Sequence, residues 1–565
     1  MWGLVALSFA IATAFAAPLD ERQAAGPVVT VNNGTVVGSS SMGIDSFKGI
    51  PFALPPTGTL RLKPPQSYNH KYPSGTIVAT GTPTACPQFY TGVNTSALPA
   101  DVTALVDQAQ AEATSQGEDC LTLNVQRPTG TTSTSKLPVI FWIYGGGFEF
   151  GSTQNDDASK FLLQGVTGLA KGHPIVYVSV NYRLNGFGFL AGKELQADGS
   201  TNLGLRDQRL GLEWVAENIA AFGGDPTKVT IWGESAGSIS VWDQFLINGG
   251  DNTYHGKPLF RAGIMDSGSI TPAEPVTTKK AQDVYNAVVA AAGCSGSANT
   301  LTCLRGLSFG AFQSAVNSLP GIFSYQGLDL SYLPRPDPAN SFFSQSPDDA
   351  TLAGKYAKLP LIIGDQEDEG TLFSLAQFNI TNTAQLITYL QSFFPVSGAA
   401  QVPGLVATYP DNPIYGSPFR TGVLYNIYPE FKRLAAILGD VTFTLTRRLM
   451  LSKVAPTVPC WSYLNSYLYG TPVTGTFHAS DVEEDYDDVV YPTPAITYQT
   501  YYTSFAYYLN PNTITNAAPL IYWPRYTTNS SMLLQSQSSS NNLLPDTFRS
   551  ASYAYLAANK GVFKV

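Results

Sequence analysis

The stretch Val229-Thr-Ile-Trp-Gly-Glu-Ser-Ala-Gly-Ser238 decides the fold. Its first four residues are apolar or β-branched and predict a buried strand, and the residues from Ser238 onward predict a helix. Between them lies G-x-S-x-G, which in this context indicates a sharp turn that holds out a nucleophilic Ser235 at the helix N-terminus. Gly233 and Gly237 flank the serine because a side chain at either place would clash with neighbouring backbone. Any glycine-rich turn can match so short a pattern, so the prediction depends on the strand before it and the helix after it.

The chain from Leu137 onward alternates short apolar runs with helical stretches. Continuous apolar strands separated by helices are typical of a parallel sheet covered on both faces. We therefore predict an α/β fold with a large, mostly parallel central sheet and helices on both of its faces. The predicted strands are 139–144, 175–180, 229–232 and 359–363, the predicted helix is 206–221, and the predicted surface loops are 129–135 and 536–542.

Composition limits the partners and cofactors to be expected. The 565 residues are 44% hydrophobic and only 13% charged, which is about half of the roughly 25% usual in soluble domains. A net charge of −9 disfavours binding to nucleic acids and to anionic membranes. The sequence has no P-loop lysine, no G-x-G-x-x-G before a helix and no zinc motif, so we expect no cofactor and no metal.

Residues 1–16 have the features of a signal peptide. The apolar stretch from Leu4 to Ala14 is too short to span a bilayer, and Ala14-Phe15-Ala16 suits signal peptidase. No other apolar segment reaches about 18 residues, so we predict a secreted, extracellular protein without a transmembrane anchor. Four N-x-[ST] sequons fit this route and are candidate glycosylation sites: Asn33, Asn94, Asn379 and Asn529.

Five cysteines allow two disulfide bridges in an oxidising compartment. Sequence separation suggests Cys294 with Cys303 and Cys86 with Cys120, and it leaves Cys460 as a buried thiol. Connectivity cannot be deduced from spacing alone, so this pairing is a hypothesis.

A serine nucleophile needs a base, and the sequence holds four histidines: His70, His173, His255 and His478. In this kind of fold the chain order is nucleophile, acid, histidine, which excludes the two histidines before Ser235. His255 follows Ser235 by 20 residues, which leaves no room for an acid-bearing strand between them. His478 therefore remains as the predicted base.

The predicted strand 359–363 leads into an acidic loop in which four carboxylates compete for the role of the acid: Asp365, Glu367, Asp368 and Glu369. Most members of such a run are expected to be solvated surface groups. Spacing cannot choose the one that orients the His478 imidazole.

The predicted strand 139–144 ends in Gly145-Gly-Gly-Phe148. Consecutive glycines after a strand can expose backbone N–H groups to a developing oxyanion without obstruction by a Cβ atom. With the amide of Ala236 they would supply three donors.

Several motifs together resemble the type-B carboxylesterase/lipase family: Glu118-Asp-Cys-Leu121, Gly145-Gly-Gly-Phe148, Asn181-Tyr-Arg183, Asn202-Leu-Gly-Leu-Arg-Asp-Gln208, Phe222-Gly-Gly-Asp-Pro226 and Gly233-Glu-Ser-Ala-Gly237. Within that family, three more motifs are similar to those of the fungal Candida rugosa-type lipases and sterol esterases: Ser331-Tyr-Leu-Pro-Arg-Pro-Asp337, Gly364-Asp-Gln-Glu-Asp-Glu-Gly-Thr371 and Gly475-Thr-Phe-His478. The resemblance covers about residues 27–565.

This resemblance implies one α/β-hydrolase domain over residues 17–565. It selects Glu369 as the acid, because in the family the acid stands immediately before Gly-Thr. It also implies that the oxyanion donors are Gly146, Gly147 and Ala236, and it implies both of the bridges suggested above.

Members of this group cover the active site with a flap closed by the first disulfide, which implies a lid within residues 86–120. From periodicity alone, a surface helix packed on the core is the better interpretation, but the position inside this loop favours a lid. The apolar positions that repeat on one narrow helical face are Val102, Leu105, Val106, Ala109 and Ala113.

The expected function is a secreted serine ester hydrolase that cleaves long-chain acylglycerols and steryl esters. Its expected partners are the lipid ester and a lipid–water interface or micelles, and a homodimer through the lid face is a further interpretation. The candidates for an apolar acyl-chain tunnel are Phe148, Ile239, Leu372 and Phe373, for each of which plain core packing is equally consistent. The alternatives are a carboxylesterase for short-chain or aromatic esters and a non-catalytic, cholinesterase-like adhesion or binding protein.

Overall fold

The computed structural model describes residues 26–90, 98–110, 115–396, 398–482, 492–514 and 517–565. The predicted signal peptide, Asn94 and Ala113 lie outside the described residues, as does the side chain of Ala109.

A mixed sheet of eleven strands crosses the described part of the chain. Its central strands, from β8 to β15 in the order below, pair in parallel, whereas the pairings toward both edges are antiparallel. From one edge to the other the strands are β16 (Asn541–Pro545), β15 (Met532–Ser536), β14 (Cys460–Asn465), β13 (Leu361–Gln366), β12 (Ala262–Asp266), β9 (Gly224–Glu234), β7 (Leu137–Ile143), β8 (Val176–Val180), β6 (Thr122–Pro128), β4 (Ile44–Pro51) and β3 (Ser39–Ser41). Two small sheets comprise β1 (Val28–Val31), β2 (Gly34–Val37) and β5 (Thr76–Val78), and β10 (Thr253–Tyr254) with β11 (Lys257–Pro258).

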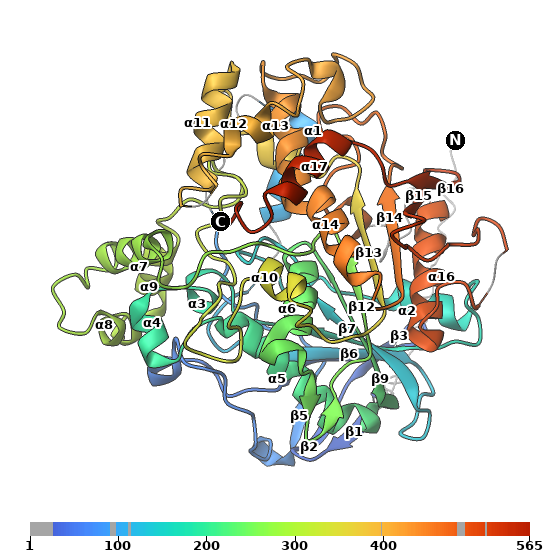
Figure 1. Cartoon of the computed structure of the whole chain (residues 1–565). Helices are drawn as coiled ribbons and strands as arrows, with labels where there is room; N and C mark the ends of the chain where they lie inside the picture. Colours follow the sequence, from blue (N-terminus) through green and yellow to red (C-terminus); the bar gives the residue numbers. More distant parts are fainter. Residues whose placement is uncertain (1–25, 91–97, 111–114, 397, 483–491, 515–516) are drawn as a thin grey trace, which may run out of the picture.

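The helices lie on both sides of this sheet and beyond one of its ends (Figure 1). They are α1 (Ala100–Gln110), α2 (Ser159–Val166), α3 (Asn185–Gly188), α4 (Lys193–Asp198), α5 (Leu203–Asn218), α6 (Ala236–Gly250), α7 (Lys279–Ala291), α8 (Thr300–Gly306), α9 (Phe309–Val316), α10 (Pro347–Leu352), α11 (Thr383–Phe393), α12 (Val402–Val406), α13 (Phe431–Gly439), α14 (Leu445–Val454), α16 (Pro492–Tyr508) and α17 (Ser550–Ala558). Short 3₁₀ turns are η1 (Gly58–Leu60), η2 (Pro73–Gly75), η3 (Ile219–Phe222), η4 (Leu372–Ser374) and η5 (Pro413–Tyr415), and η6 (Asp440–Thr444) is a π turn.

Alternation along the central strands explains why both faces of the sheet are covered. Successive side chains of a strand point to opposite faces, and these strands are apolar at nearly every position. Trp232 packs against Phe161 of α2, with ring centroids 5.5 Å apart. On the opposite face, α5 comes so close that a Cβ atom at Gly211 would lie 3.3 Å from Phe141. The predicted class, a mostly parallel sheet with helices on both faces, is confirmed.

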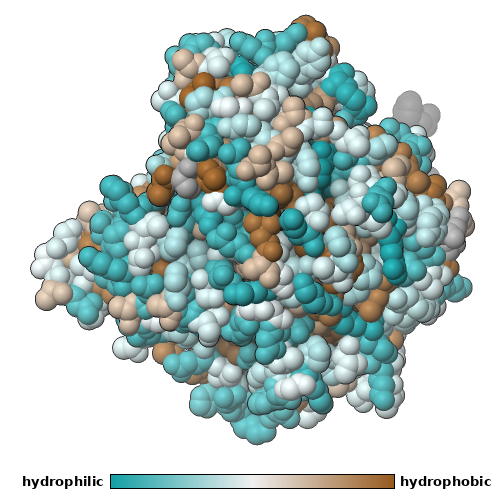
Figure 2. Space-filling view, in the orientation of Figure 1, coloured by the Kyte–Doolittle hydropathy of each residue, from teal (hydrophilic) through white to brown (hydrophobic). Residues whose placement is uncertain are grey.

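A second apolar core lies beyond the sheet, where α1, α11, α12, α13 and α17 gather at one end of the molecule (Figure 1). The carboxyl ends of β13 and β14 point toward this group. In open α/β sheets, ligands bind outside the carboxyl ends of the strands. Elsewhere on the viewed face, hydrophobic side chains form scattered spots among hydrophilic ones (Figure 2).

The predicted elements are present, with corrections at their ends. Strand β9 begins at Gly224, before the apolar run that predicts it. The helix predicted over 206–221 spans Leu203–Asn218 instead, because 3₁₀ turn η3 follows and Gly223, at φ 90°, ends it. The loop predicted over 536–542 is shorter than expected, because Ser536 pairs with Asn541 in the β15–β16 hairpin.

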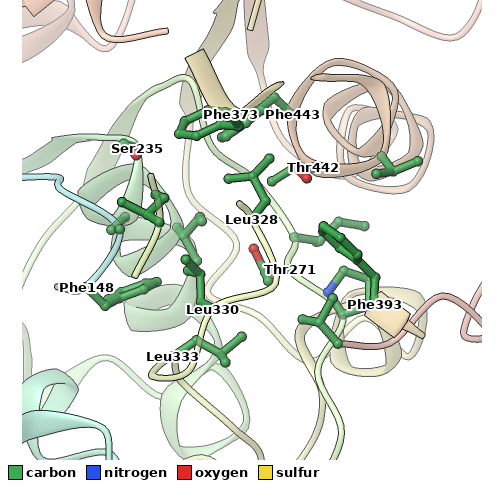
Figure 3. Close-up of a pocket in the computed structure, with 18 of the residues that line it drawn as sticks. Phe148, Ser235, Thr271, Leu328, Leu330, Leu333, Phe373, Phe393, Thr442 and Phe443 are labelled. Atoms are coloured by element: carbon green, nitrogen blue, oxygen red, sulfur yellow. The ribbon is translucent and has the colours of Figure 1, made fainter. Parts of the chain in front are cut away.

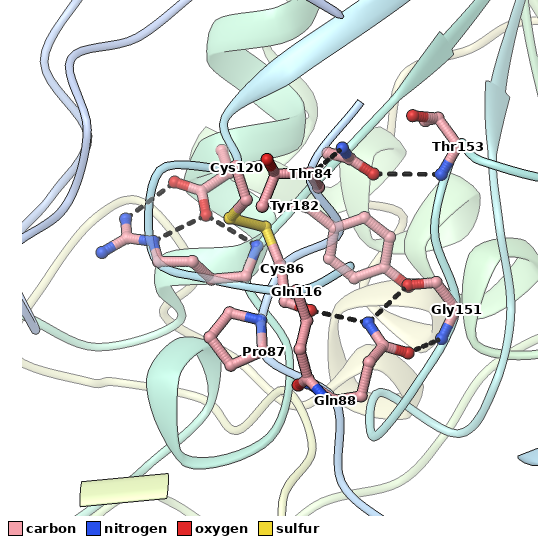
Figure 4. Close-up of a disulfide and its surroundings, with 12 residues drawn as sticks. Thr84, Cys86, Pro87, Gln88, Gln116, Cys120, Gly151, Thr153 and Tyr182 are labelled. Carbon is pink, nitrogen blue, oxygen red and sulfur yellow. Dashed lines mark hydrogen bonds and ion pairs between the residues drawn. A yellow bond between two sulfur atoms is a disulfide. The ribbon is translucent and has the colours of Figure 1, made fainter. Parts of the chain in front are cut away.

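Two disulfides join the pairs that were expected, Cys86 with Cys120 and Cys294 with Cys303. Cys460 is free and buried, and burial raises the pKa of its thiol. Figure 4 shows the Cys86–Cys120 bridge and its surroundings. Close to Cys120 in sequence, Glu118 accepts from the Arg61 guanidinium with both carboxyl oxygens, at 2.5 and 2.7 Å, which holds the return of the loop in place.

Candidate active site

The nucleophile turn follows strand β9 and opens helix α6. Ser235 has φ 55° and ψ −122°, a backbone conformation that residues other than glycine rarely adopt. A Cβ atom at Gly237 would lie 1.9 Å from the Ile143 carbonyl oxygen, and one at Gly233 would lie 2.5 Å from Gly237 backbone. The expectation that both glycines permit close backbone approach is confirmed.

Three side chains from distant parts of the chain form one hydrogen-bonded line. His478 Nε2 lies 2.8 Å from Ser235 Oγ, and His478 Nδ1 lies 2.5 Å from Glu369 Oε2. All three side chains are buried. By contrast, His70 and His255 are exposed. This line has the geometry of a nucleophile, a base and an orienting acid.

The other three carboxylates of the acidic loop have different partners. Asp365 accepts from Arg447 Nε at 2.6 Å. Glu367 accepts from Arg420 Nε at 2.7 Å. Asp368 accepts from Ser417, Phe419 and Thr476. The expectation that most of this run is solvated is wrong, because Asp365, Asp368 and Glu369 are each at most 1% exposed.

Backbone contacts fix the carboxyl group of Glu369. The Gln366 N–H donates to Glu369 Oε1 at 2.7 Å, which leaves Oε2 for the imidazole. The next residue must be glycine, because a Cβ atom at Gly370 would lie 1.9 Å from the Ala435 carbonyl oxygen. Asp368 ties this loop to the histidine loop, because its N–H donates to Thr476 O at 2.9 Å and its Oδ2 accepts from Thr476 N–H at 3.0 Å. Burial raises the pKa of Asp368 to about 7.

The glycine loop after β7 lies beside the serine. A Cβ atom at Gly145 would lie 2.9 Å from Ser235 Cβ. Gly146 and Gly147 have positive φ values of 87° and 63°, and within the described chain neither N–H donates to a backbone carbonyl. Ala236 is the first residue of α6, where an N–H has no partner inside the helix. These three N–H groups therefore stay the candidate oxyanion donors beside Ser235.

An apolar cavity leads away from Ser235 into the second core (Figure 3). It runs past Leu328 and Phe443 toward Phe393, with Phe148 and Leu333 on another wall. The polar side chains on its walls are few, Thr271 and Thr442 apart from Ser235 itself. Such a shape accommodates a flexible hydrocarbon chain better than a charged ligand.

A second, wider hollow meets the first at Ser235. His478, the glycine loop and Phe477 line it. Leu105 and Val106 of α1 form part of its wall, and Val102 and Val106 are each 2% exposed. Ala104 and Asp107, off that face, are exposed. Helix α1 therefore lies with its apolar face over the hollow.

The predicted tunnel residues divide between the two hollows. Phe148, Ile239 and Phe373 line the inner cavity, and Leu372 and Phe373 line the outer one. Sequence reasoning missed several inner residues, none of which adjoins a catalytic motif in the sequence: Leu328, Leu330, Phe393, Phe394, Val441, Phe443 and Phe563.

Comparisons with known proteins agree with this geometry. The model of the carboxylesterase family matches residues 25–409. The chain belongs to the carboxylesterase family. It is 52% identical to secreted lipase 1 of Botryotinia fuckeliana over 100% of this chain and 99% of the relative. It is 50% identical to a secreted triacylglycerol lipase of Gibberella zeae, over 97% and 93%, and 44% identical to lipase 5 of Diutina rugosa, over 98% and 100%.

Solved structures of esterases share the fold. EstA of Aspergillus niger superposes with a TM-score of 0.78 at 26% identity, covering 95% of this chain and 99% of that one. A thermophilic PNB esterase gives a TM-score of 0.73 at 27% identity, with coverage of 93% and 99%. The α/β-hydrolase fold of this carboxylesterase is thereby established.

Two surface features of this carboxylesterase bear on its sequons. The Asn33 amide donates to the Tyr68 and His70 carbonyls at 2.8 and 2.9 Å, so its nitrogen is engaged in the fold. Asn379 and Asn529 are exposed, but the Asn379 amide also donates, to the Tyr325 hydroxyl at 3.2 Å.

The described residues form neither a metal-binding cluster nor a membrane-spanning helix. No group of three or more His, Cys, Asp or Glu side chains there is placed to hold a metal ion. No helix in that same part of the carboxylesterase is both long enough and apolar enough to cross a membrane.

Proposed function

We propose that this carboxylesterase is a secreted serine ester hydrolase that cleaves esters of long acyl chains, acylglycerols above all, through an acyl-enzyme. The observation that carries the proposal is the junction of the Ser235–His478–Glu369 line with a deep apolar cavity. Relatives named as secreted lipases, including one named a triacylglycerol lipase, support the same substrate class and the same location.

In the first half of the reaction, Ser235 Oγ attacks the ester carbonyl carbon while His478 Nε2 takes its proton over the 2.8 Å contact. Glu369 accepts from Nδ1, which holds the imidazole in the tautomer whose Nε2 is free to act as a base, and it stabilises the imidazolium that forms. The N–H groups of Gly146, Gly147 and Ala236 stabilise the oxyanion.

In the second half, His478 returns the proton to the leaving alcohol oxygen, and the acyl group remains on Ser235. Water, activated by the same imidazole, then hydrolyses this acyl-enzyme and releases the fatty acid. No cofactor takes part in this sequence.

The inner cavity sets the acyl preference. Each methylene group buried there contributes about 0.8 kcal/mol, so binding favours longer chains until the cavity between Leu328 and Phe393 is full. The wider outer hollow, where Phe477 and Val482 lie, would hold the alcohol part of the ester, whether glycerol or a sterol.

Helix α1 acts as a lid in this account. Leu105 and Val106 form part of the wall of the outer hollow, and the Cys86–Cys120 bridge confines the loop that carries the helix. Opening exposes the apolar face of α1 together with the cavity mouth, at about 25 cal/mol for each Å². A lipid–water interface, a micelle or a second copy of the chain covers these surfaces and favours the open form.

A carboxylesterase for short-chain or aromatic esters is the second candidate, and the structural neighbours named EstA and PNB esterase favour it. The depth of the apolar cavity argues against short acyl groups as the preferred ones. A non-catalytic binding protein would not need Ser235, His478 and Glu369 in hydrogen-bond contact.

A substrate panel tests the proposal. The purified chain is given p-nitrophenyl acetate, p-nitrophenyl palmitate, triolein and cholesteryl oleate, with Ser235→Ala as the matched control. We expect the highest kcat/KM on long acyl chains, and we expect a serine-directed organophosphate to label Ser235. A preference for acetate would favour the short-chain alternative, and absence of both turnover and labelling would leave the binding-protein interpretation.

A further inference from the structure

A buried carboxyl group follows the glycine loop and has no cation beside it. Glu149 is 1% exposed. Its Oε2 accepts from the Ile322 N–H at 2.8 Å, and its Oε1 is buried with no hydrogen-bond partner in the described part of the chain. None of the ion pairs recorded there involves Glu149.

The backbone of Glu149 holds the glycine loop in its turn. Its N–H donates to Gly146 O at 3.0 Å. Its carbonyl accepts from the Phe89 N–H at 3.0 Å and from the Asn185 side chain at 3.3 Å. The position of the carboxyl group is therefore tied rigidly to that of the proposed oxyanion donors.

The residue that this carboxyl group binds packs on one of those donors. A Cβ atom at Gly147 would lie 2.7 Å from Ile322 Cδ1, so the isoleucine methyl lies directly over the glycine. The Ile322 side chain lines both hollows at Ser235. A continuous path thus runs from Glu149 through the Ile322 backbone and side chain to Gly147.

The surroundings favour the neutral form of the acid. The titratable group that interacts electrostatically with Glu149 is Tyr332. This fully buried phenol donates to Val316 O at 2.9 Å and carries no positive charge. Burial raises the pKa of Glu149 to about 8, and the Ile322 hydrogen bond opposes this only in part.

We propose that Glu149, as a neutral carboxylic acid, is a positioning residue that holds Ile322 against the oxyanion glycine Gly147, and that loss of its proton ends activity at alkaline pH. This inference rests on the proposed ester hydrolysis. The ionised carboxylate would be a buried charge with one hydrogen bond, a state that is relieved when water enters or the Ile322 segment moves. Either change displaces the methyl group that packs on Gly147.

The test compares pH–rate profiles of the full chain on soluble p-nitrophenyl butyrate from pH 6 to pH 10. At pH 9.5, which is 1.5 units above a pKa of about 8, about 3% of wild-type Glu149 is protonated, so we expect kcat/KM about 30-fold below its maximum. Glu149→Gln keeps an acceptor for the Ile322 N–H and cannot ionise. It should stay within about threefold of its own pH 7 activity at pH 9.5.

Two further variants separate positioning from simple folding. Glu149→Ala loses the acceptor and should lower kcat at every pH, with rescue by the glutamine variant. Asp243→Asn is the matched control: Asp243 is a fully buried acid on α6 with both carboxyl oxygens unpartnered in the described chain and a pKa raised by burial, and it lines neither hollow. Its profile should keep the wild-type alkaline fall.

Stability provides an independent readout. A carboxyl group whose pKa is raised on folding contributes its full stability below the unfolded value of about 4.5 and loses it as the pH rises toward about 8. The melting temperature of Glu149→Gln should therefore fall less than that of the wild type between pH 5 and pH 8.

An alkaline fall in Glu149→Gln that matches the wild type would overturn the inference, because another group would then be responsible. Organophosphate labelling of Ser235 in each variant keeps this outcome apart from failure of the proposed function. In the latter case the wild type itself would neither turn over ester nor take the label.

Discussion

The nucleophile turn and the helix α1 face each other across the outer hollow and are built in opposite ways. At the turn, Gly237 has no room for even one additional carbon, and Ser235 is held in an unfavourable backbone conformation by the packing around it. Among the side chains of α1 that the structure describes, Val102 and Val106 are buried, and Ala104 and Asp107 are exposed to solvent.

Because of this difference, we expect the two regions to have different roles. Catalytic groups need fixed geometry, because small displacements cost large factors in rate. Access to the cavity needs an element whose detachment costs little, and elements with few buried contacts open most readily. Changes at the turn should therefore act on the chemical step, and changes on α1 should act on the response to a lipid surface.

The largest effect is expected at the turn itself. Ser235→Ala or His478→Ala should lower kcat on every ester by on the order of 10⁶-fold, because the nucleophile and its base act as one unit. The measurement is steady-state turnover of p-nitrophenyl butyrate by a folded variant, checked by its melting curve. A variant that kept a tenth of the activity would show that the catalytic groups are elsewhere.

The next effect separates the acid from its neighbours. Glu369→Gln should lower kcat by about 10⁴-fold, since the imidazole loses its orienting charge while the nucleophile survives. Asp365→Asn is the matched control in the same loop, because Asp365 pairs with Arg447 rather than with His478. This change should lower the melting temperature, and it should lower kcat much less than Glu369→Gln does. The opposite ranking of the two variants on kcat would reassign the acid.

These two carboxylates also show where sequence reasoning reached its limit. The serine turn was predictable because only glycine permits the backbone to approach as it does at Gly233 and Gly237. The choice of acid was not predictable from spacing, and it came from the family resemblance. The physical reason is that Arg447, Arg420 and Ser417, each far away in sequence, engage the three competing carboxylates.

The cavity could be predicted only in its first residues. Phe148, Ile239 and Phe373 adjoin catalytic motifs and were found for that reason. Leu328 and Phe393 are brought to the cavity by the packing of the second core, and no local sequence pattern predicts that packing. For the same reason, the neutral Glu149 could not be recognised from the sequence.

Blocking the inner cavity should separate effects on substrate binding from effects on the chemical step, and its effect on rate should be smaller than those above. Leu328→Trp places an indole between Ser235 and Phe393, so kcat/KM on p-nitrophenyl palmitate should fall about 10- to 100-fold while the value on the acetate stays within about threefold. Leu543→Trp, at the exposed edge strand β16, is the control and should change neither. Equal losses on both esters would mean that the acyl chain lies elsewhere.

The smallest effect, and the one that isolates α1, is expected from Leu105→Ser with Val106→Ser. Both side chains line the outer hollow, so their replacement weakens the apolar face that an interface covers. We expect the increase in hydrolysis rate on emulsified ester to be a few-fold smaller than in the wild type, and we expect unchanged turnover of soluble p-nitrophenyl acetate. Ala104→Ser, on the exposed side of the same helix, should behave as the wild type.

The most direct test of a rigid site gated by a loosely held helix is the rate of tributyrin hydrolysis followed through its solubility limit. The wild type should show a steep increase in rate once droplets form, and the double serine variant should show a shallower one, with Ser235 equally labelled by organophosphate in both. Smooth saturation through the limit, identical in the two proteins, would contradict the account and leave α1 as a packed surface helix of a lidless carboxylesterase.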